Sequence, residues 1–138
     1  MSGTMDEMQS EDYEGVAALW EEVGFWPHVA EDRAWYERAL ARNPGCALVW
    51  REDGRIVGTV VGGWDGLRGW IYHLGVSLGY QGKGLGRALL AKAEARLHAR
   101  GVGQINLMVD DTNARAEAFY LRAGYEPSPV KTLRKRFV

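Results

Sequence analysis

The sequence predicts an α/β (α+β) fold with a mixed, mostly antiparallel sheet, one parallel strand pair and helices on both faces. Two segments with helical periodicity precede a hairpin of two apolar strands. A third strand is followed by a glycine-rich turn, a long helix and a short strand, which is the order of a parallel crossover unit. Helices on either side of this unit can cover both faces of the sheet.

Two helices are expected in the first third of the chain. The first begins after Ser10, a residue type that caps helix starts, and Gly24 stops it. The second begins after Asp32 and ends at the turn Asn43-Pro44-Gly45. The segment Phe25-Trp26-Pro27 is expected to be a turn between them.

Three strand signals follow the second helix. Residues 47–51 and 56–61 predict a hairpin, with Asp53-Gly54 in its turn. Trp64-Asp65-Gly66 breaks the chain again. Residues 70–76 alternate large apolar side chains, which is typical of a strand with one buried face.

The rest of the chain alternates between helix and strand. A long helix is expected over about residues 84–100, with Leu85, Leu89 and Leu97 on one side. A short strand over 104–109 follows it. Asn113 begins a last helix that Gly124 ends. Its apolar face at helical spacing consists of Ala116, Phe119, Tyr120 and Ala123. The tail over 125–138 can form one or two strands, which its prolines confine to an edge or interrupt.

Length and composition restrict the class of protein. The 138 residues fit one domain, so residues 1–138 are expected to fold as a single unit. A net charge of -1 gives no electrostatic reason to expect nucleic acid or an anionic membrane as partner. The sequence has neither a signal peptide nor an apolar run of membrane-spanning length, so a cytoplasmic protein is expected. Its one cysteine, Cys46, lies in an apolar run and is expected to be a buried structural thiol.

The glycine-rich turn is the strongest functional signal from the residues alone. It comprises Gln81-Gly82-Lys83-Gly84-Leu85-Gly86-Arg87, between a strand and a helix start. Glycines let the backbone approach a ligand, and the first N–H groups of a helix point outward at the positive end of its dipole. Lys83 and Arg87 add two full charges, so the turn suits a phosphate or pyrophosphate.

Two common phosphate motifs do not fit this turn. A P-loop requires a serine or threonine after its lysine, but Gly84 follows Lys83. A dinucleotide-binding turn requires a third glycine where Arg87 or Leu89 stands. A glycine-rich helix entry with solvated basic residues stays open as the structural alternative.

Two motifs in this order resemble the GNAT superfamily of N-acetyltransferases. The first reads Q/R-x-x-G-x-G/A and consists of Gln81, Gly84 and Gly86, preceded by Leu74-Gly75-Val76. The second reads N-x-x-A-x-x-F/L-Y-x-x-x-G-F/Y and extends from Asn113 to Tyr125. The resemblance covers nearly the whole chain, and residues 58–66 further resemble a group of short bacterial members.

The resemblance implies a GNAT acyl-CoA N-acyltransferase fold with acetyl-CoA as co-substrate and no metal ion. The strands at 70–76 and 104–109 would splay apart, with a bulge near Gly75. The pantetheine arm would pair with the backbone of Leu74 and Val76, and the turn would bind the pyrophosphate. The residues expected to bind the coenzyme are Leu74, Gly75, Val76, Gln81, Gly82, Lys83, Gly84, Leu85, Gly86, Arg87, Asn113 and Tyr120.

Transfer of an acetyl group to an amine needs proton acceptors and donors. An alkylammonium with a pKa of about 10.4 is roughly 0.1% neutral at physiological pH, so a base or a water chain must take its proton. The resemblance implies that the hydroxyl of Tyr120 points at the coenzyme sulfur. Tyr120 is therefore expected to be the acid, with a core residue as the alternative. The backbone N–H of Val76 is expected to stabilise the oxyanion.

The base is less clearly indicated. Many relatives carry a glutamate on the strand before the turn, but residues 70–74 contain no carboxylate. Histidine is the residue type with an ordinary pKa near neutrality, and His73 is the only one on that strand. His73 is therefore the expected base, with a structural histidine as the alternative. Asp110, Asp111, Glu22 and a water relay stay open.

The acceptor side of the site shows weaker signals. The acceptor is expected to be a primary amine of a small molecule or an amino group of a protein. Its pocket would lie between the first two helices and the loop at Trp64, lined by aromatic residues that could equally belong to the core. These residues are Trp20, Phe25, Trp26 and Trp64. The family's opening strand would fall on the weak strand signal at Met5-Asp6-Glu7-Met8.

Two other functions compete with acetyl transfer. The missing glutamate raises the alternative of a coenzyme-A-binding module with little or no catalysis, acting as a sensor or structural partner. A nucleotide-phosphate module on the same turn is a further alternative. The sequence leaves open whether the chain forms a homodimer, as relatives often do.

Overall fold

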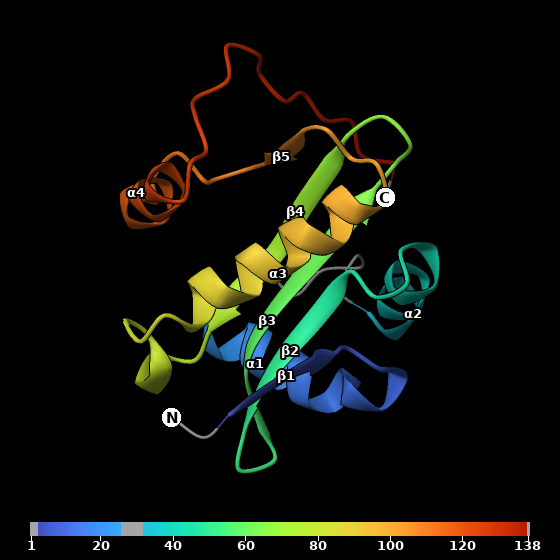
Figure 1. The fold of residues 1–138 in the computed structure, drawn as a ribbon, viewed down its shortest axis with the longest axis vertical. Coiled ribbons are helices and arrows are strands. Elements are labelled where there is room, and N and C mark those ends of the chain that lie inside the picture. Colours follow the sequence, from blue (N-terminus) through green and yellow to red (C-terminus); the bar gives the residue numbers. More distant parts are fainter. Residues whose placement is uncertain (1–2, 26–31, 138) are drawn as a thin grey trace. The chain divides into compact units, whose positions relative to one another are not determined.

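A five-stranded sheet with the order β1-β2-β3-β4-β5 organises the computed structural model, which describes residues 3–25 and 32–137. The first four strands pair antiparallel, and β5 runs parallel to β4. The strands are β1 (Thr4–Glu7), β2 (Ala47–Glu52), β3 (Arg55–Trp64), β4 (Gly69–Val76) and β5 (Ile105–Leu107), shown in Figure 1. This mixed, mostly antiparallel sheet confirms the predicted fold class.

Helices cover both faces of the sheet. The α-helices are α1 (Tyr13–Glu22), α2 (Arg33–Arg42), α3 (Leu85–Ala99) and α4 (Ala114–Arg122), and two short 3-10 helices are η1 (Ser10–Asp12) and η3 (Leu78–Tyr80). Figure 1 shows α3 on one side of the sheet and α1 on the other. The chain divides into two compact units, Met1–Met108 with the sheet and α1 to α3, and Val109–Val138 with α4. That residues 1–138 form a single domain stays a prediction.

Each face of the sheet has its own apolar core. On the α1 and α2 side, the buried cluster consists of Met8, Val16, Leu19, Trp20, Tyr36, Ala47, Val49, Ile56 and Val61. The helix α3 buries Leu85, Leu89, Leu90, Ala93 and Leu97, which include the three leucines expected on one helix side. Burying a side chain of this size stabilises a fold by roughly 1.5–3 kcal/mol, so these two faces hold the first unit together.

The helix boundaries follow the sequence signals closely. Asp32 caps α2, because its Oδ1 accepts a hydrogen bond from Trp35 N at 2.8 Å. Ser10 does not cap the first helix as expected, since its hydroxyl donates to Glu37 Oε2 instead. The chain enters that helix through η1, where Gln9 N donates to Asp12 Oδ2 at 2.8 Å. Trp26 and Pro27 of the expected turn lie outside the described residues.

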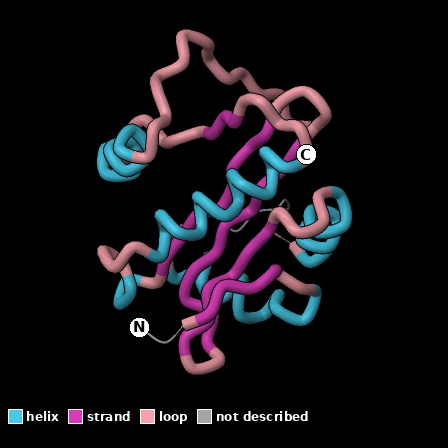
Figure 2. The backbone as a smooth tube through the Cα atoms, viewed as in Figure 1, coloured by secondary structure: helices cyan, strands magenta, loops and turns pink. Residues whose placement is uncertain are grey.

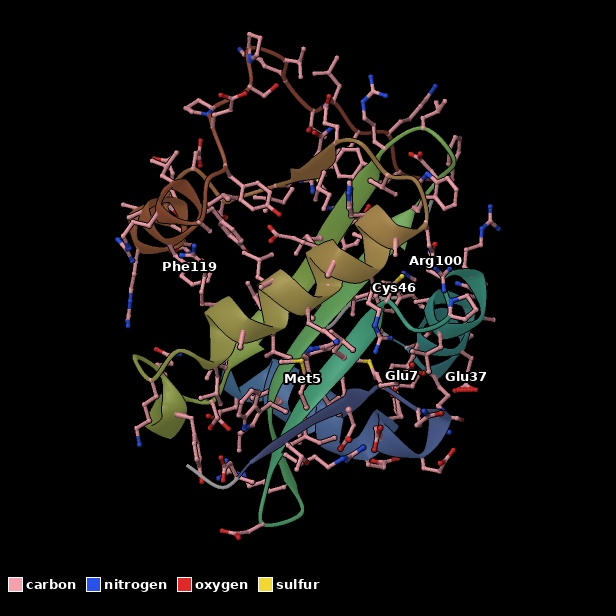
Figure 3. The ribbon with its side chains drawn as sticks, viewed as in Figure 1. Met5, Glu7, Glu37, Cys46, Arg100 and Phe119 are labelled. Carbon is pink, nitrogen blue, oxygen red and sulfur yellow. The ribbon has the colours of Figure 1, made fainter. Side chains whose placement is uncertain are left out.

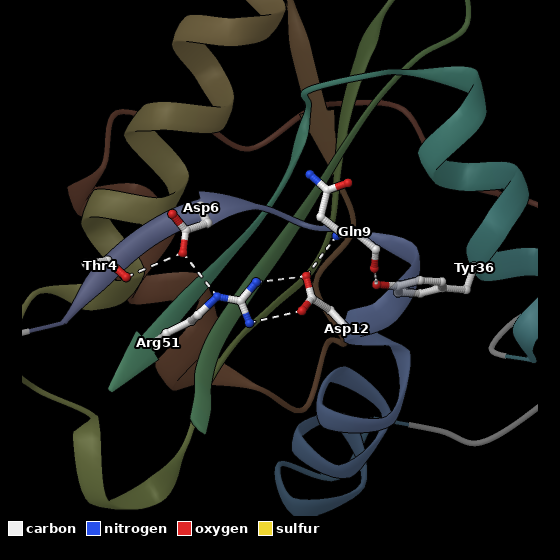
Figure 4. A network of polar contacts seen from close by, with 6 residues as sticks. All are labelled: Thr4, Asp6, Gln9, Asp12, Tyr36 and Arg51. Atoms are coloured by element: carbon white, nitrogen blue, oxygen red, sulfur yellow. Dashed lines mark hydrogen bonds and ion pairs between the residues drawn. The ribbon is translucent and has the colours of Figure 1, made fainter. Parts of the chain in front are cut away.

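The weak strand signal at residues 5–8 corresponds to an edge strand, β1, which runs from Thr4 to Glu7 and pairs with β2. Arg51 on β2 anchors this edge, with its Nε 3.1 Å from Asp6 Oδ2 and its Nη1 3.0 Å from Asp12 Oδ1 (Figure 4). One guanidinium therefore ties β2 to both β1 and η1. Pairing with β2 compensates for the low strand propensity of the local sequence.

The tail departs from the prediction. Residues 126–137 contain neither helix nor strand, so the expected tail strands are wrong for the described part of the chain. The prolines at 127 and 129 remove two backbone donors that a strand needs.

Cys46 lies just before β2 (Figure 3). It is fully buried, as expected, and burial raises the pKa of its thiol.

Candidate functional site

The central feature of the site is the second half of β4. This strand pairs with β5 only from Gly69 to Ile71, whereas its pairing with β3 continues to Val76. Figure 2 shows β5 as a short strand beside one end of the longer β4. Residues 72–76 therefore extend past the parallel pair, with one side hydrogen-bonded to β3.

A β-bulge interrupts β4 within this segment. Between Thr59 and Val61 on β3, the partner changes from Gly75 to Tyr72, so His73 and Leu74 together oppose a single β3 residue. His73 has φ of 50°, which is uncommon for a residue other than glycine. The bulge is thus present in the expected strand but precedes the expected position at Gly75.

Gly75 does not form the bulge, and its role is to allow close packing. It pairs regularly with Thr59, and a Cβ added to it would lie 3.0 Å from the ring of Phe25 and 3.3 Å from Val23. The backbone of β4 must therefore come close to the segment that follows α1. Only a residue without a side chain allows that approach without displacing Phe25.

The hydrogen bonds of β4 determine where its other backbone groups point. Ser77 N donates to Val57 O at 2.8 Å, and alternate residues of an antiparallel strand face the same neighbour. Gly75 therefore also faces β3, while the N–H and C=O groups of Val76 point to the opposite edge; Leu74 belongs to the bulge and lies outside this regular alternation. That Leu74 and Val76 bind the coenzyme stays a prediction.

Gln81 joins the end of β4 to the glycine-rich turn. Its Nε2 donates to Val76 O at 2.9 Å, so the side chain folds back onto the strand. The turn then continues through Gly82 and Gly84, with φ of 77° and 89°. This left-handed conformation suits glycine, which explains these two residues at this point of the chain.

The start of α3 can receive an anion. Gly84 is its N-cap, and no side chain caps the helix within the described residues. The first N–H groups of a helix have no partner inside it and carry partial positive charge. The flanking cations, Lys83 and Arg87, are exposed, and Lys83 Nζ lies 5.6 Å from the centre of the Tyr80 ring. Phosphate oxygens fit this combination of donors and charge.

Three aromatic rings surround the imidazole of His73. The ring centres of Trp20, Phe25 and Trp35 lie 4.4, 5.2 and 5.4 Å from its own. Trp20 is only 3% exposed, so it belongs to the core, the alternative considered for it. Phe25 and Trp64 are half-buried, and Trp26 lies outside the described residues.

Two of the other candidate bases accept several hydrogen bonds. The carboxylate of Glu22 accepts from Ser77 Oγ at 2.6 Å and from Leu78 N at 3.0 Å, and these bonds lower its pKa. Asp110 accepts from the hydroxyl and the N–H of Thr112, which likewise lower its pKa. A carboxylate with a lowered pKa is a weaker base, so both are better explained as anchors of their loops. Asp111 is exposed.

The helix α4 carries the two remaining predicted residues, in the second unit. Asn113 is its N-cap, with Oδ1 accepting from Ala116 N at 3.1 Å. Tyr120 is half-buried, with its ring centre 5.2 Å from that of Phe119 and 5.7 Å from that of Tyr125. Burial raises the pKa of Tyr120 to about 12, so its phenol keeps its proton at neutral pH.

The structure thus brings together the predicted residues from Leu74 to Arg87 in the first unit, while Asn113 and Tyr120 belong to the second. Sequence reasoning missed Thr59, a fully buried hydroxyl that contacts the bulge. A threonine inside the apolar run of β3 was its only signal.

Among the described residues, no cluster of His, Cys, Asp or Glu side chains could hold a metal ion. No helix in the described part is both long and apolar enough to cross a membrane.

Comparison with known proteins connects this geometry to one family. The sequence profile of the acetyltransferase (GNAT) family matches residues 4–125. Acetyltransferases of Pectobacterium atrosepticum and Yersinia pseudotuberculosis are each 37% identical over 130 residues, which are 94% of this chain and 92% of theirs.

Solved structures of other proteins share the fold. Ard1 of Thermoplasma volcanium matches with a TM-score of 0.84 at 21% identity, covering 93% of this chain and 85% of that one. The PaiA N-acetyltransferase of Thermoplasma acidophilum, solved in complex with coenzyme A, also has a TM-score of 0.84. It is 17% identical and covers 95% of this chain and 94% of its own.

Proposed function

Because this chain belongs to the acetyltransferase (GNAT) family, we propose that it transfers an acetyl group directly from acetyl-CoA to a primary amine. It is an acetyl-CoA-dependent N-acetyltransferase, and its acceptor is an amine of a small molecule or an amino group of a protein. The observation that carries this proposal is the outward-facing edge of β4, which Gln81 joins directly to the uncapped start of α3. Together they would offer backbone hydrogen-bonding groups and positive charge to an elongated, phosphate-bearing ligand.

The coenzyme would extend along this surface. Its pyrophosphate would bind the N–H groups between Gly82 and Arg87, with Lys83 and Arg87 neutralising charge. Its pantetheine arm would pair with the backbone of Leu74 and Val76, as an added strand does. Asn113 would contact the arm near its thiol end.

The chemistry requires attack by a neutral amine on the thioester carbonyl. As the C–N bond forms, the carbonyl oxygen becomes an oxyanion, for which the N–H of Val76 is the proposed donor. The C–S bond then breaks, and Tyr120 donates to the departing sulfur. Since its pKa of about 12 exceeds the value of roughly 8.5 for an ordinary thiol, Tyr120 acts more by hydrogen bonding than by complete proton transfer.

His73 is the proposed base, directly or through a water relay. Its place beside Leu74 on β4 supports this role, as do the hydrogen bonds that already occupy Glu22 and Asp110. Replacement by asparagine is the sharpest test, because asparagine tolerates the positive φ of 50° but cannot accept the proton. We expect His73→Asn to lower kcat most strongly at neutral and lower pH. An unchanged pH–rate profile would exclude His73 as the base.

Tyr120→Phe tests the proposed acid. We expect kcat to fall by about 10²–10⁴-fold while the affinity for coenzyme A changes little, because the variant keeps the ring and loses only the donor. Release of coenzyme A is measured with a thiol reagent across a panel of amines. Cys46 is fully buried and contributes little background. An unchanged rate removes Tyr120 from the mechanism.

The remaining parts of the proposal concern the chain as a whole. Residues 1–138 are proposed to act as one N-acetyltransferase domain in the cytoplasm, without nucleic acid or membrane as partner. A homodimer is also proposed, and light scattering on the purified protein tests it. If coenzyme A binds tightly but no amine in the panel is acetylated, the alternative of a non-catalytic coenzyme-A-binding module replaces this proposal.

A further inference from the structure

Thr59 connects three elements through one buried hydroxyl. It lies in the middle of β3, is fully buried and stands among apolar neighbours. Its Oγ1 accepts a hydrogen bond from Trp20 Nε1 at 3.0 Å and donates one to His73 O at 2.9 Å. The indole of α1, the hydroxyl of β3 and the bulge of β4 are therefore linked in a row.

The second of these bonds acts at the bulge itself. A bulge disrupts the regular ladder, so its extra peptide needs another contact to hold its orientation. The carbonyl that Thr59 holds belongs to the peptide between His73 and Leu74, just after the left-handed φ of His73. Fixing this carbonyl fixes the direction in which the strand resumes.

The strand that resumes there carries the edge proposed to bind the coenzyme. Leu74 is the next residue, and Val76 follows two positions later. The orientation of the backbone at both residues therefore depends on the direction of the strand after the bulge. Gly75 between them pairs with Thr59 itself. The same residue thus contacts β4 twice, once through its backbone pairing and once through its side chain.

We propose that Thr59 is a positioning residue, whose hydroxyl holds the bulge of β4 so that the N–H groups of Leu74 and Val76 face the thioester end of the acyl coenzyme. This inference rests on the proposed function. It assigns to Thr59 a role in the reaction beyond satisfying the buried N–H of Trp20. Small displacements of such donors reduce catalysis strongly, because the reaction depends on their aim.

Thr59→Val is the central variant, because valine has nearly the same shape and strand propensity but no hydroxyl. We expect kcat/KM for acetyl-CoA to fall on the order of 10- to 100-fold. Thr59→Ser retains the hydroxyl and is expected to recover most of this loss. Val102→Ala, a core variant between α3 and β5, is the control for lowered stability alone, and it should leave both kinetic constants near those of the wild type.

A second comparison separates the two hydrogen bonds. Trp20→Phe removes the bond from the indole and leaves the bond from Thr59 to His73 O, so its kinetic loss should be clearly smaller than that of Thr59→Val. Equal losses would overturn the proposal, because the hydroxyl would then serve the tryptophan alone. A loss in Val102→Ala as large as that in Thr59→Val would overturn it too, since lowered stability would explain both.

A direct readout keeps this inference distinct from the proposed function. In amide NMR spectra of the free proteins, Thr59→Val should shift the signals of Leu74 and Val76, whereas Thr59→Ser should not. Failure of the wild type to bind coenzyme A in calorimetry would contradict the proposed function, and unmoved amide signals would contradict the role of Thr59. If Thr59→Val does not fold, Thr59→Cys, whose thiol is a weak donor, takes its place with the same expected order of effects.

Discussion

Replacing Gly84 by alanine tests the left-handed backbone at the start of α3. Its φ is 89°, and an added Cβ would meet no atom within 4 Å in the described part of the chain. The substitution therefore introduces backbone strain without a clash. This conformation costs an L-residue about 1–2 kcal/mol, and the stiffer unfolded chain offsets about 0.4–1 kcal/mol of that. We expect a net loss of about 1 kcal/mol.

The turn can show this loss in two ways. If it keeps its conformation, the free energy of unfolding falls by about 1 kcal/mol. If it relaxes to a negative φ, the N–H groups of Leu85 and Gly86 turn away from the ligand. The same free energy then appears as a rise of about fivefold in the Kd of coenzyme A.

Urea denaturation and calorimetric titration with coenzyme A measure the two quantities on the same samples. Gly79→Ala is the matched control, because Gly79 also has open space around its α-carbon but lacks a positive φ. Gly84→Asn should recover part of the loss, since asparagine tolerates the left-handed region. The reasoning is wrong if Gly84→Ala matches Gly79→Ala in both unfolding free energy and Kd.

Three further predictions concern single side chains. Arg51→Lys should lower the free energy of unfolding by about 1 kcal/mol in urea denaturation, because an ammonium cannot bridge both carboxylates that the guanidinium joins. Cys46 should react with a thiol reagent only as fast as the protein unfolds, since the thiol is buried with a raised pKa; rapid labelling of the native protein would contradict its burial. Glu22→Gln should lower the melting temperature at pH 7 and much less at pH 3. The hydrogen bond from Ser77 lowers the pKa of Glu22, so its stabilisation is present above the ordinary value of 4.5 and disappears as the pH falls through the lowered one.

Local patterns predicted most of the regular structure. Asp32 caps α2 as expected, and the leucines at helical spacing in α3 are all buried. Residues 70–76 alternate and form most of β4. In each case the residues that specify the element lie within or beside it, so sequence spacing suffices to recognise it.

Long-range contacts decided what the local patterns missed. β1 forms from a charged segment because β2 offers it a pairing edge and Arg51 holds its carboxylate. The bulge lies at His73 and Leu74 instead of Gly75, which pairs regularly with Thr59 and packs closely against Phe25. Neither the pairing edge nor the aromatic neighbour can be recognised from nearby residues.

The glycine-rich turn shows both kinds of information at one place. Its glycines, its cations and its position at a helix start were readable from the sequence, because left-handed φ values and helix-start N–H groups are local properties. The sequence by itself therefore determined that this chain carries an anion-binding turn at the end of a strand, and its motifs indicated the family. Only the tertiary structure decided where β4 bulges, which edge its backbone presents and how Gln81 and Thr59 hold it. Those features depend on hydrogen bonds between residues that come together only when the sheet and α1 have packed.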